Sequence, residues 1–142
     1  MTPEQNVIIW ARGLLGREFV WGETDCVMLT LKAMDIFHGG EYAERFRGKW
    51  SNQEEALAYY DITSPSEMLP AYGGQRVLGT FAVLGDIITV TSEEWPERCH
   101  FVLGARSLSS TEDGGVSLIP TRFLTNLPDA IVWRVPCQPQ SR

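Results

Sequence analysis

Apolar residues in the first part of the chain recur at intervals of three or four, the spacing that places them on one face of an α-helix. Helix starts are marked by capping boxes, in which a serine or threonine precedes a glutamate or glutamine by three positions. Three such boxes open at Thr2, Ser51 and Ser64. A further helix is expected to begin at Thr24 or Asp25 and to end at a pair of glycines. The pattern therefore predicts four helices, over residues 2–16, 24–38, 51–60 and 64–70.

The pattern changes after Tyr72, where short runs rich in β-branched residues alternate with turns that contain glycine, aspartate or proline. The runs cover residues 76–83, 86–91, 100–103, 106–111, 116–119 and 130–135. A chain with its helices first and its strands second is typical of the α+β class. We therefore expect N-terminal helices packed on an antiparallel β-sheet of about five to six strands.

Length and composition indicate one globular domain. The 142 residues are enough for one core, and 44% hydrophobic with 21% charged residues is ordinary for such a domain. We expect the domain over residues 1–137 and a polar tail over residues 138–142. The net charge of −6 argues against a nucleic-acid partner, which a basic face would normally bind. No leader and no long apolar run occurs, so we expect synthesis in a cytoplasm without membrane insertion.

Three cysteines, Cys26, Cys99 and Cys137, offer candidate chemistry. They form no C-x-x-C pair and their number is odd, so we expect no disulfide framework, no metal and no cofactor. Cys26 follows Asp25, a natural N-cap, which places the cysteine in the first turn of a helix. There the free backbone N–H groups and the helix dipole favour a thiolate and can receive an oxyanion. The alternative is a small buried residue near a helix start.

The same segment contains an aromatic-x-Trp-Gly stretch, Phe19-Val20-Trp21-Gly22, that leads into Asp25-Cys26 at the expected helix start. This arrangement resembles the nucleophile motif of the NlpC-type cell-wall peptidases. Further residues match, in chain order, a branch of that family found among phage tail proteins. These matches are Tyr42, Phe46, Arg47, Gly48, Trp50, Ser51, Gly85-Asp86 and Trp133-Arg134-Val135. The resemblance implies a papain-like fold with Cys26 as the nucleophile.

A cysteine nucleophile needs a proton acceptor, usually a histidine, and the chain has two. His38 follows Cys26 by twelve residues on the same expected helix, about 18 Å away, and we interpret it as a helix-end residue. His100 opens an expected strand of apolar residues that ends in a glycine. The catalytic histidine of the resembled family stands at this place. The resemblance therefore implies a Cys26–His100 dyad, and the alternative is a structural strand histidine.

The residue that orients the histidine stands on the following strand in the resembled family. Ser107 and Ser109 share one face of that strand by alternation, so either could meet the imidazole. The family commonly has His, Asn or Gln there, so a backbone carbonyl and a water are the alternatives. Cys99 should point to the strand face opposite His100, into the core, and Cys137 has no evident partner.

Side chains near the expected dyad are candidates for binding substrate. We expect this role for Trp21, Asp25 and Arg106, with Arg98 as a second arginine able to hold a carboxylate. Two departures from the family pattern, bulkier residues after the cysteine and Phe19 in place of a tyrosine, leave room for an inactive site.

The resemblance implies a tail-associated cysteine peptidase or amidase that cleaves peptide bonds of bacterial peptidoglycan. Such a protein would be made in the host cytoplasm, lie at the tail tip of the virion beside other tip or hub proteins, and act in the host cell wall or periplasm. The first alternative is a structural tail-tip or baseplate protein that keeps the fold with little or no activity. The second is acyl transfer or deamidation by the same Cys-His pair.

Overall fold

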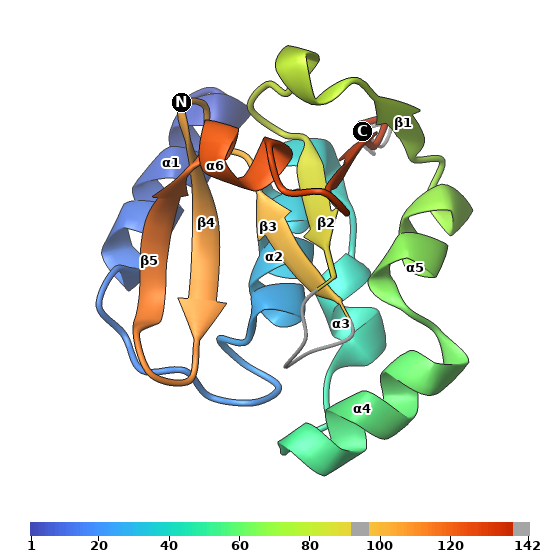
Figure 1. Ribbon diagram of the computed structural model, residues 1–142. Coiled ribbons are helices and arrows are strands. Elements are labelled where there is room, and N and C mark those ends of the chain that lie inside the picture. Colours follow the sequence, from blue (N-terminus) through green and yellow to red (C-terminus); the bar gives the residue numbers. More distant parts are fainter. Residues whose placement is uncertain (92–96, 138–142) are drawn as a thin grey trace.

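The computed structural model describes residues 1–91 and 97–137 as a mixed α+β chain (Figure 1). The helical elements are α1 (Pro3–Leu14), α2 (Cys26–Met34), the π-helical turn η1 (Asp35–Gly39), α3 (Tyr42–Phe46), α4 (Gln53–Ile62), α5 (Pro65–Ala71), the 3-10 turn η2 (Gly79–Phe81) and α6 (Thr121–Thr125). The strands are β1 (Gln75–Val77), β2 (Ile87–Val90), β3 (Arg98–Phe101), β4 (Arg106–Thr111), β5 (Gly115–Pro120) and β6 (Ile131–Arg134). The expected polar tail lies outside the described residues. No helix within the described ranges has the length and apolarity that crossing a bilayer requires.

Local capping explains where the helices begin. Thr2 caps α1 through a reciprocal box with Gln5, with hydrogen bonds of 3.0 and 3.1 Å, as the sequence predicts. The box expected at Ser51 is shifted by one residue: Asn52 caps α4 by accepting the Glu55 N–H at 2.9 Å. Ser51 instead donates its N–H and its hydroxyl to the Glu55 carboxylate. The four expected helices therefore begin within about one residue of the expected starts, although Ser64 makes no side-chain cap bond at the start of α5. The short helices α3 and α6 were not expected and have no side-chain cap.

All strand pairs are antiparallel, but they form two ladders instead of the single expected sheet. The larger ladder has the order β1-β6-β2-β3, and β4 and β5 form a hairpin beside it. An isolated bridge between Val102 and Ser107 joins the hairpin to the chain just after β3. The described part of the chain thus contains six antiparallel strands, as many as expected, divided between the two ladders.

The prediction of a strand over residues 76–83 is wrong for most of that range. Strand β1 ends at Val77, and the chain continues into the 3-10 turn η2. Leu78 and Phe81 are 70% and 62% exposed, so this apolar run leaves the sheet instead of filling the core. A short apolar run does not by itself indicate whether it will be buried.

Two hydrophobic clusters lie on opposite faces of the four-stranded ladder. The larger cluster joins α1 and α2 to one face and includes Ile87, Cys99 and Phe101. The smaller cluster lies on the other face, includes Ile88 and Val102, and is covered by a residue of α6. In Figure 1, α1 and α2 lie behind the strands and α6 lies in front of them. Successive residues of β2 and β3 therefore point alternately toward α2 and away from it.

Candidate active site around Cys26

Cys26 is the first residue of α2, as the sequence predicts. Asp25 is the N-cap, with an extended backbone (φ −69°, ψ 164°), and its Oδ1 accepts the Met28 N–H at 2.9 Å. The cap stops the helix from extending backward, because its backbone is not helical. The cysteine is thereby held at the helix N-terminus, where backbone N–H groups are not used within the helix.

The Asp25 carboxylate also joins two other segments to this helix start. Its Oδ2 accepts the Gly22 N–H at 2.6 Å and the Trp50 indole N–H at 2.9 Å, and the residue is 1% exposed. Gly22 has a φ of 82°, which brings its backbone against the Trp50 carbonyl where no side chain would fit. Both carboxylate oxygens are thus occupied by the protein's own N–H groups. Asp25, expected to bind substrate, has a structural task at this site.

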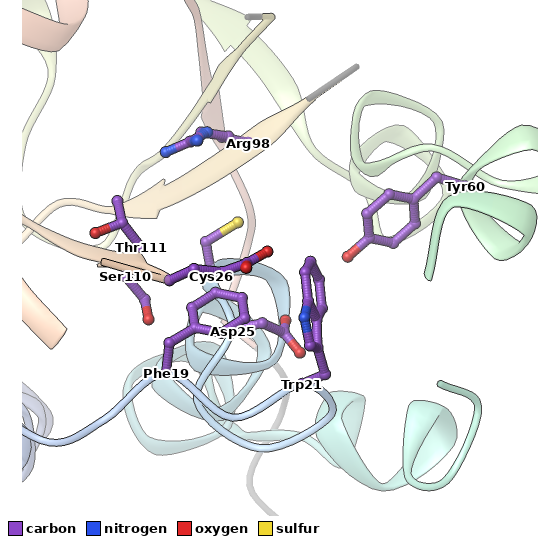
Figure 2. A pocket seen from close by; sticks show the side chains of 9 residues that line it. Phe19, Trp21, Asp25, Cys26, Tyr60, Arg98, Ser110 and Thr111 are labelled. Carbon is purple, nitrogen blue, oxygen red and sulfur yellow. The ribbon is translucent and has the colours of Figure 1, made fainter. Parts of the chain in front are cut away.

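A small pocket borders Cys26, and the space between its lining atoms, including the part open to solvent, is about 360 Å³. In Figure 2, Trp21 and Tyr60 lie to one side of Cys26 and Arg98 lies above it. The lining consists of Phe19, Trp21, Asp25, Cys26, Tyr60, Arg98, Ser110, Thr111 and Glu112. The structure therefore brings Trp21, Asp25 and Arg98 to Cys26, as expected. Tyr60 comes from α4 and belongs to no motif, so the sequence did not indicate it.

The Cys26 thiol is hard to ionise. Burial raises its pKa to about 11, and the charge of Asp25 acts in the same direction. Hydrogen bonds from the Cys99 and Val27 backbones and the charge of Arg98 lower this pKa, but by less than burial raises it. A pKa near 11 leaves about one thiol in ten thousand ionised at pH 7. The expectation that the helix start would ease ionisation is wrong here, because desolvation outweighs the N-terminal N–H groups.

His100 lies on the opposite face of β3 from Cys26. In the ladder it pairs with Ile88, a residue of the smaller cluster. Its neighbour Cys99 belongs to the larger cluster, against which Cys26 packs. Strand alternation therefore directs the His100 side chain away from the face on which Cys26 packs. The Cys26–His100 dyad stays a prediction that this geometry does not favour.

Cys99 occupies the β3 position that faces α2. It is 3% exposed and points away from the His100 face, which confirms the expectation from strand alternation. Burial raises the pKa of its thiol, and the nearby Cys26 contributes to that rise. The β3 side chain near Cys26 is therefore the thiol of Cys99 and not the imidazole of His100.

The observed partner of His100 is a backbone carbonyl instead of a serine. Its Nδ1 lies 3.0 Å from the carbonyl oxygen of Leu108, in the middle of β4. Ser107 Oγ lies 2.8 Å from the hydroxyl of Thr121, and Ser109 is 2% exposed on the same face of β4. The orienting role expected of Ser107 or Ser109 is thus taken at Nδ1 by a carbonyl, one of the alternatives that the sequence left open.

Arg106 lies away from Cys26. It opens β4, whereas Ser110 and Thr111 at the other end of that strand line the pocket, about 13 Å further along the strand. Arg106 instead lines a separate groove beside α1. The expectation that Arg106 would stand beside the nucleophile is wrong for this geometry, and Arg98 is the arginine that lines the pocket.

Acid should destabilise the fold through His100. Burial lowers its pKa to about 4, opposed by the Leu108 hydrogen bond and assisted by the charge of Arg98. Between about pH 6.5 and pH 4 the unfolded chain binds more protons, so stability is complete above this window and falls as pH decreases through it. In urea titrations, lowering the pH from 7 to 4 should reduce the free energy of unfolding of wild type. The reduction for His100→Gln should be about 3 kcal/mol smaller.

The comparison with His100→Gln isolates one residue. Burial also lowers the pKa of His38, but His38 titrates in both proteins and its contribution cancels. The glutamine amide can still donate to the Leu108 carbonyl, so the hydrogen bond itself is retained. Equal losses of stability in the two proteins would contradict the assignment of a buried, neutral His100.

The chemical groups around Cys26 suit binding better than bond cleavage. The pocket offers a protonated thiol, the guanidinium of Arg98, and the hydroxyls of Tyr60, Ser110 and Thr111. An arginine beside aromatic walls can hold an anionic group. Within residues 1–91 and 97–137, no three His, Cys, Asp or Glu side chains gather in a way that could hold a metal ion.

Comparison with known proteins places the chain by family but not by activity. A family model described as "Domain of unknown function (DUF6950)" matches residues 5–130, which is most of the chain. No curated protein matches the chain closely enough to count as a relative.

Proposed function

Since this chain belongs to the DUF6950 family, whose description assigns no function, we propose a function from its own site: a structural component of a phage or phage-like tail tip. In this proposal the chain keeps a papain-like fold of the NlpC type and contacts other tail-tip proteins in the virion. It does not use Cys26 as a nucleophile. The observation that carries the proposal is the placement of Cys26 and His100 on opposite faces of β3.

A papain-like fold is supported by the arrangement of α2 and the strands. A helix that begins with Cys26 packs on one face of an antiparallel ladder, mainly against β3. The remaining matches to the NlpC-type family follow in the same chain order. The packing of α2 on the antiparallel ladder is therefore the structural support for a papain-like fold.

The residues that carry the resemblance have structural tasks, which fits a fold retained without activity. Gly22 and Trp50 donate to the buried Asp25 carboxylate. The Asp86 carboxylate forms a salt bridge with Arg134, in which the guanidinium donates two hydrogen bonds to it. A folded chain needs these contacts whether or not Cys26 reacts, so the motifs do not by themselves require catalysis.

A peptidase that cleaves peptide bonds of bacterial peptidoglycan is the second candidate. One observation favours it: backbone hydrogen bonds from Cys99 and Val27 reach Cys26 at a helix N-terminus, an arrangement that can also stabilise an oxyanion. Against it stand the pKa of the thiol, near 11, and the composition of the described pocket, whose lining includes no histidine. We therefore favour the structural function.

Replacing Cys26 with alanine should leave the biological role intact. In the phage or phage-like element that encodes the chain, deletion of the gene is expected to abolish infective particles. Supplying the Cys26→Ala chain should restore the wild-type titre, because no step uses the thiol. The measurement is the titre of infective particles, together with the amount of the chain in purified particles.

A matched control separates loss of chemistry from loss of fold. Asp25→Ala removes three hydrogen bonds from the same helix start and is expected not to restore particles. The proposal is contradicted if Cys26→Ala is incorporated at normal levels and the titre still falls by about a hundredfold or more, the smaller end of the loss expected for a missing nucleophile.

A further inference from the structure

A second cysteine and the second histidine meet at the far end of the helical segment that Cys26 begins. Cys137 follows β6 and is exposed, and its Sγ lies 3.8 Å from Nδ1 of His38. The two residues are 99 positions apart in the chain, so only the fold brings them together. Neither belongs to the site around Cys26, whose lining contains neither residue.

The imidazole of His38 is fixed with its Nδ1 toward this thiol. Its Nε2 lies 2.8 Å from the carbonyl oxygen of Gly85, which can only accept, so Nε2 carries the proton and Nδ1 is left as an acceptor. The His38 ring packs edge-on against Phe37 and Phe101, with centroids 4.9 and 6.2 Å away, and the residue is 4% exposed. The acceptor nitrogen is thus oriented by a carbonyl and by two rings.

The carbonyl that orients His38 is itself held in place. Gly85 has a φ of 100°, a conformation that glycine adopts readily, and the Phe37 ring occupies the space where a side chain would stand. The Gly85 N–H donates to the Val102 carbonyl at 2.9 Å. The resulting order of groups, thiol, imidazole and carbonyl, is the order in which a cysteine nucleophile, its base and the group that orients the base occur in enzymes.

From this geometry we propose that Cys137 is the reactive thiol of the chain, that His38 accepts its proton, and that Cys137 undergoes thiol–disulfide exchange with a disulfide-bearing molecule. The proton moves from Sγ of Cys137 to Nδ1 of His38. The thiolate attacks one sulfur of the disulfide, a new S–S bond forms, and the old S–S bond breaks. The departing thiolate takes the proton back from Nδ1, so His38 ends neutral and Cys137 ends in a mixed disulfide.

The groups beside His38 bear on its proton-accepting role in opposite directions. Burial lowers the pKa of His38, so the ring is neutral at pH 7 with Nδ1 open to a proton, although the ring is also a weaker base. The Gly85 hydrogen bond and the charge of Asp86 act against that shift and stabilise the imidazolium that forms when the proton arrives. The other two cysteines lack this combination: burial raises the thiol pKa of both Cys26 and Cys99. Exchange is therefore expected at Cys137 alone of the three thiols.

The test is the rate of reaction with a coloured aromatic disulfide, dithiobis(nitrobenzoate), at pH 7. The native protein is expected to release one thiolate per chain about tenfold faster than a synthetic peptide of residues 133–142, which has the same cysteine without the fold. Cys137→Ser should abolish this fast reaction. His38→Gln, with folding checked by circular dichroism, should slow it to the rate of the peptide.

A second arm distinguishes the source of the disulfide. Incubation with oxidised glutathione should add one glutathione to the native protein and none to Cys137→Ser, as measured by intact mass; addition only with a protein disulfide would assign a protein partner. A native rate equal to or below the peptide rate overturns the proposal, even if His38→Gln fails to fold. Wild-type reactivity in a folded His38→Gln variant overturns it as well.

Discussion

Asp25→Ala is expected to lower the free energy of unfolding by about 4 kcal/mol, because one buried carboxylate satisfies three N–H donors. Alanine leaves the Gly22 and Trp50 donors without an acceptor in a region where Asp25 is only 1% exposed. Each lost hydrogen bond to a charged group costs about 1.5–3 kcal/mol, and the losses are not fully additive. Urea unfolding at pH 7, followed by tryptophan fluorescence, measures the effect.

Asp25→Ser provides the matched comparison for this prediction. Serine is also a good N-cap and can still accept the Met28 N–H, but its side chain is too short to reach Trp50. It should recover about 1 kcal/mol relative to alanine. If Asp25→Ala costs less than about 1 kcal/mol, the carboxylate is not the group that joins these segments.

Arg134→Met is expected to cost about 3 kcal/mol, because it leaves the Asp86 carboxylate buried without its ionic partner. Arg134 Nε and Nη2 donate to the two oxygens of Asp86 at 2.9 Å each, and the Asp86 side chain is 2% exposed. Of the hydrogen bonds that the described residues make to this carboxylate, the one from the Val83 N–H, at 3.0 Å, remains in the variant. The arginine side chain is 47% exposed, so water entering the vacated space reduces the cost below that of a fully buried pair.

Two further variants separate the ion pair from the arginine itself. Asp86→Asn combined with Arg134→Met removes both charges and should recover about 1 kcal/mol or more of the loss. Arg76→Met replaces an exposed arginine of the neighbouring strand β1 and should change stability by less than about 0.5 kcal/mol. Equal losses for Arg76→Met and Arg134→Met in urea unfolding would contradict the role of the Asp86–Arg134 pair.

The pair also explains two motifs that look unrelated in the sequence. Gly85-Asp86 immediately precedes β2, and Arg134, the last residue of β6, follows Asp86 by forty-eight positions. The ladder places β2 beside β6, so the aspartate and the arginine become neighbours. Their separation in the chain hid the contact, because the register of β2 against β6 is a property of the folded sheet.

Features that depend on neighbours in the chain were predictable. Thr2 with Gln5, and Asp25 before Cys26, mark helix starts because a cap involves side chains within three residues. The α+β class followed from the order of the periodic segments. The capping role of Asp25 was likewise predictable, but its bond to Trp50 was not, since 25 positions separate the two residues.

The predicted partner of Cys26 depended on something finer than element order. A shift of one residue along a strand moves a side chain to the opposite face. His100 lies next to Cys99 in β3, and that single step directs the imidazole to the face with the smaller cluster and the second thiol to the face that packs on α2. A motif read from the sequence locates the strand, but the face on which each side chain lies depends on how the strand packs.

The pairing of His38 with Cys137 was missed for a related reason. The sequence indicated His38 as a helix-end residue, and it does lie in the last turn of the helical segment, in η1. Its ring, however, is held by Gly85 and faces a cysteine at the end of the last strand. No local pattern near Cys137 predicts that contact.

The central claim is that Cys26 is not a catalytic nucleophile, and digestion of purified peptidoglycan tests it most directly. Wild-type chain and Cys26→Ala are each incubated with the same peptidoglycan, and the soluble fragments are measured by mass spectrometry. The account predicts that neither protein releases stem-peptide fragments above the level of buffer alone. Release by the wild type, with no release by a folded Cys26→Ala chain, would contradict it.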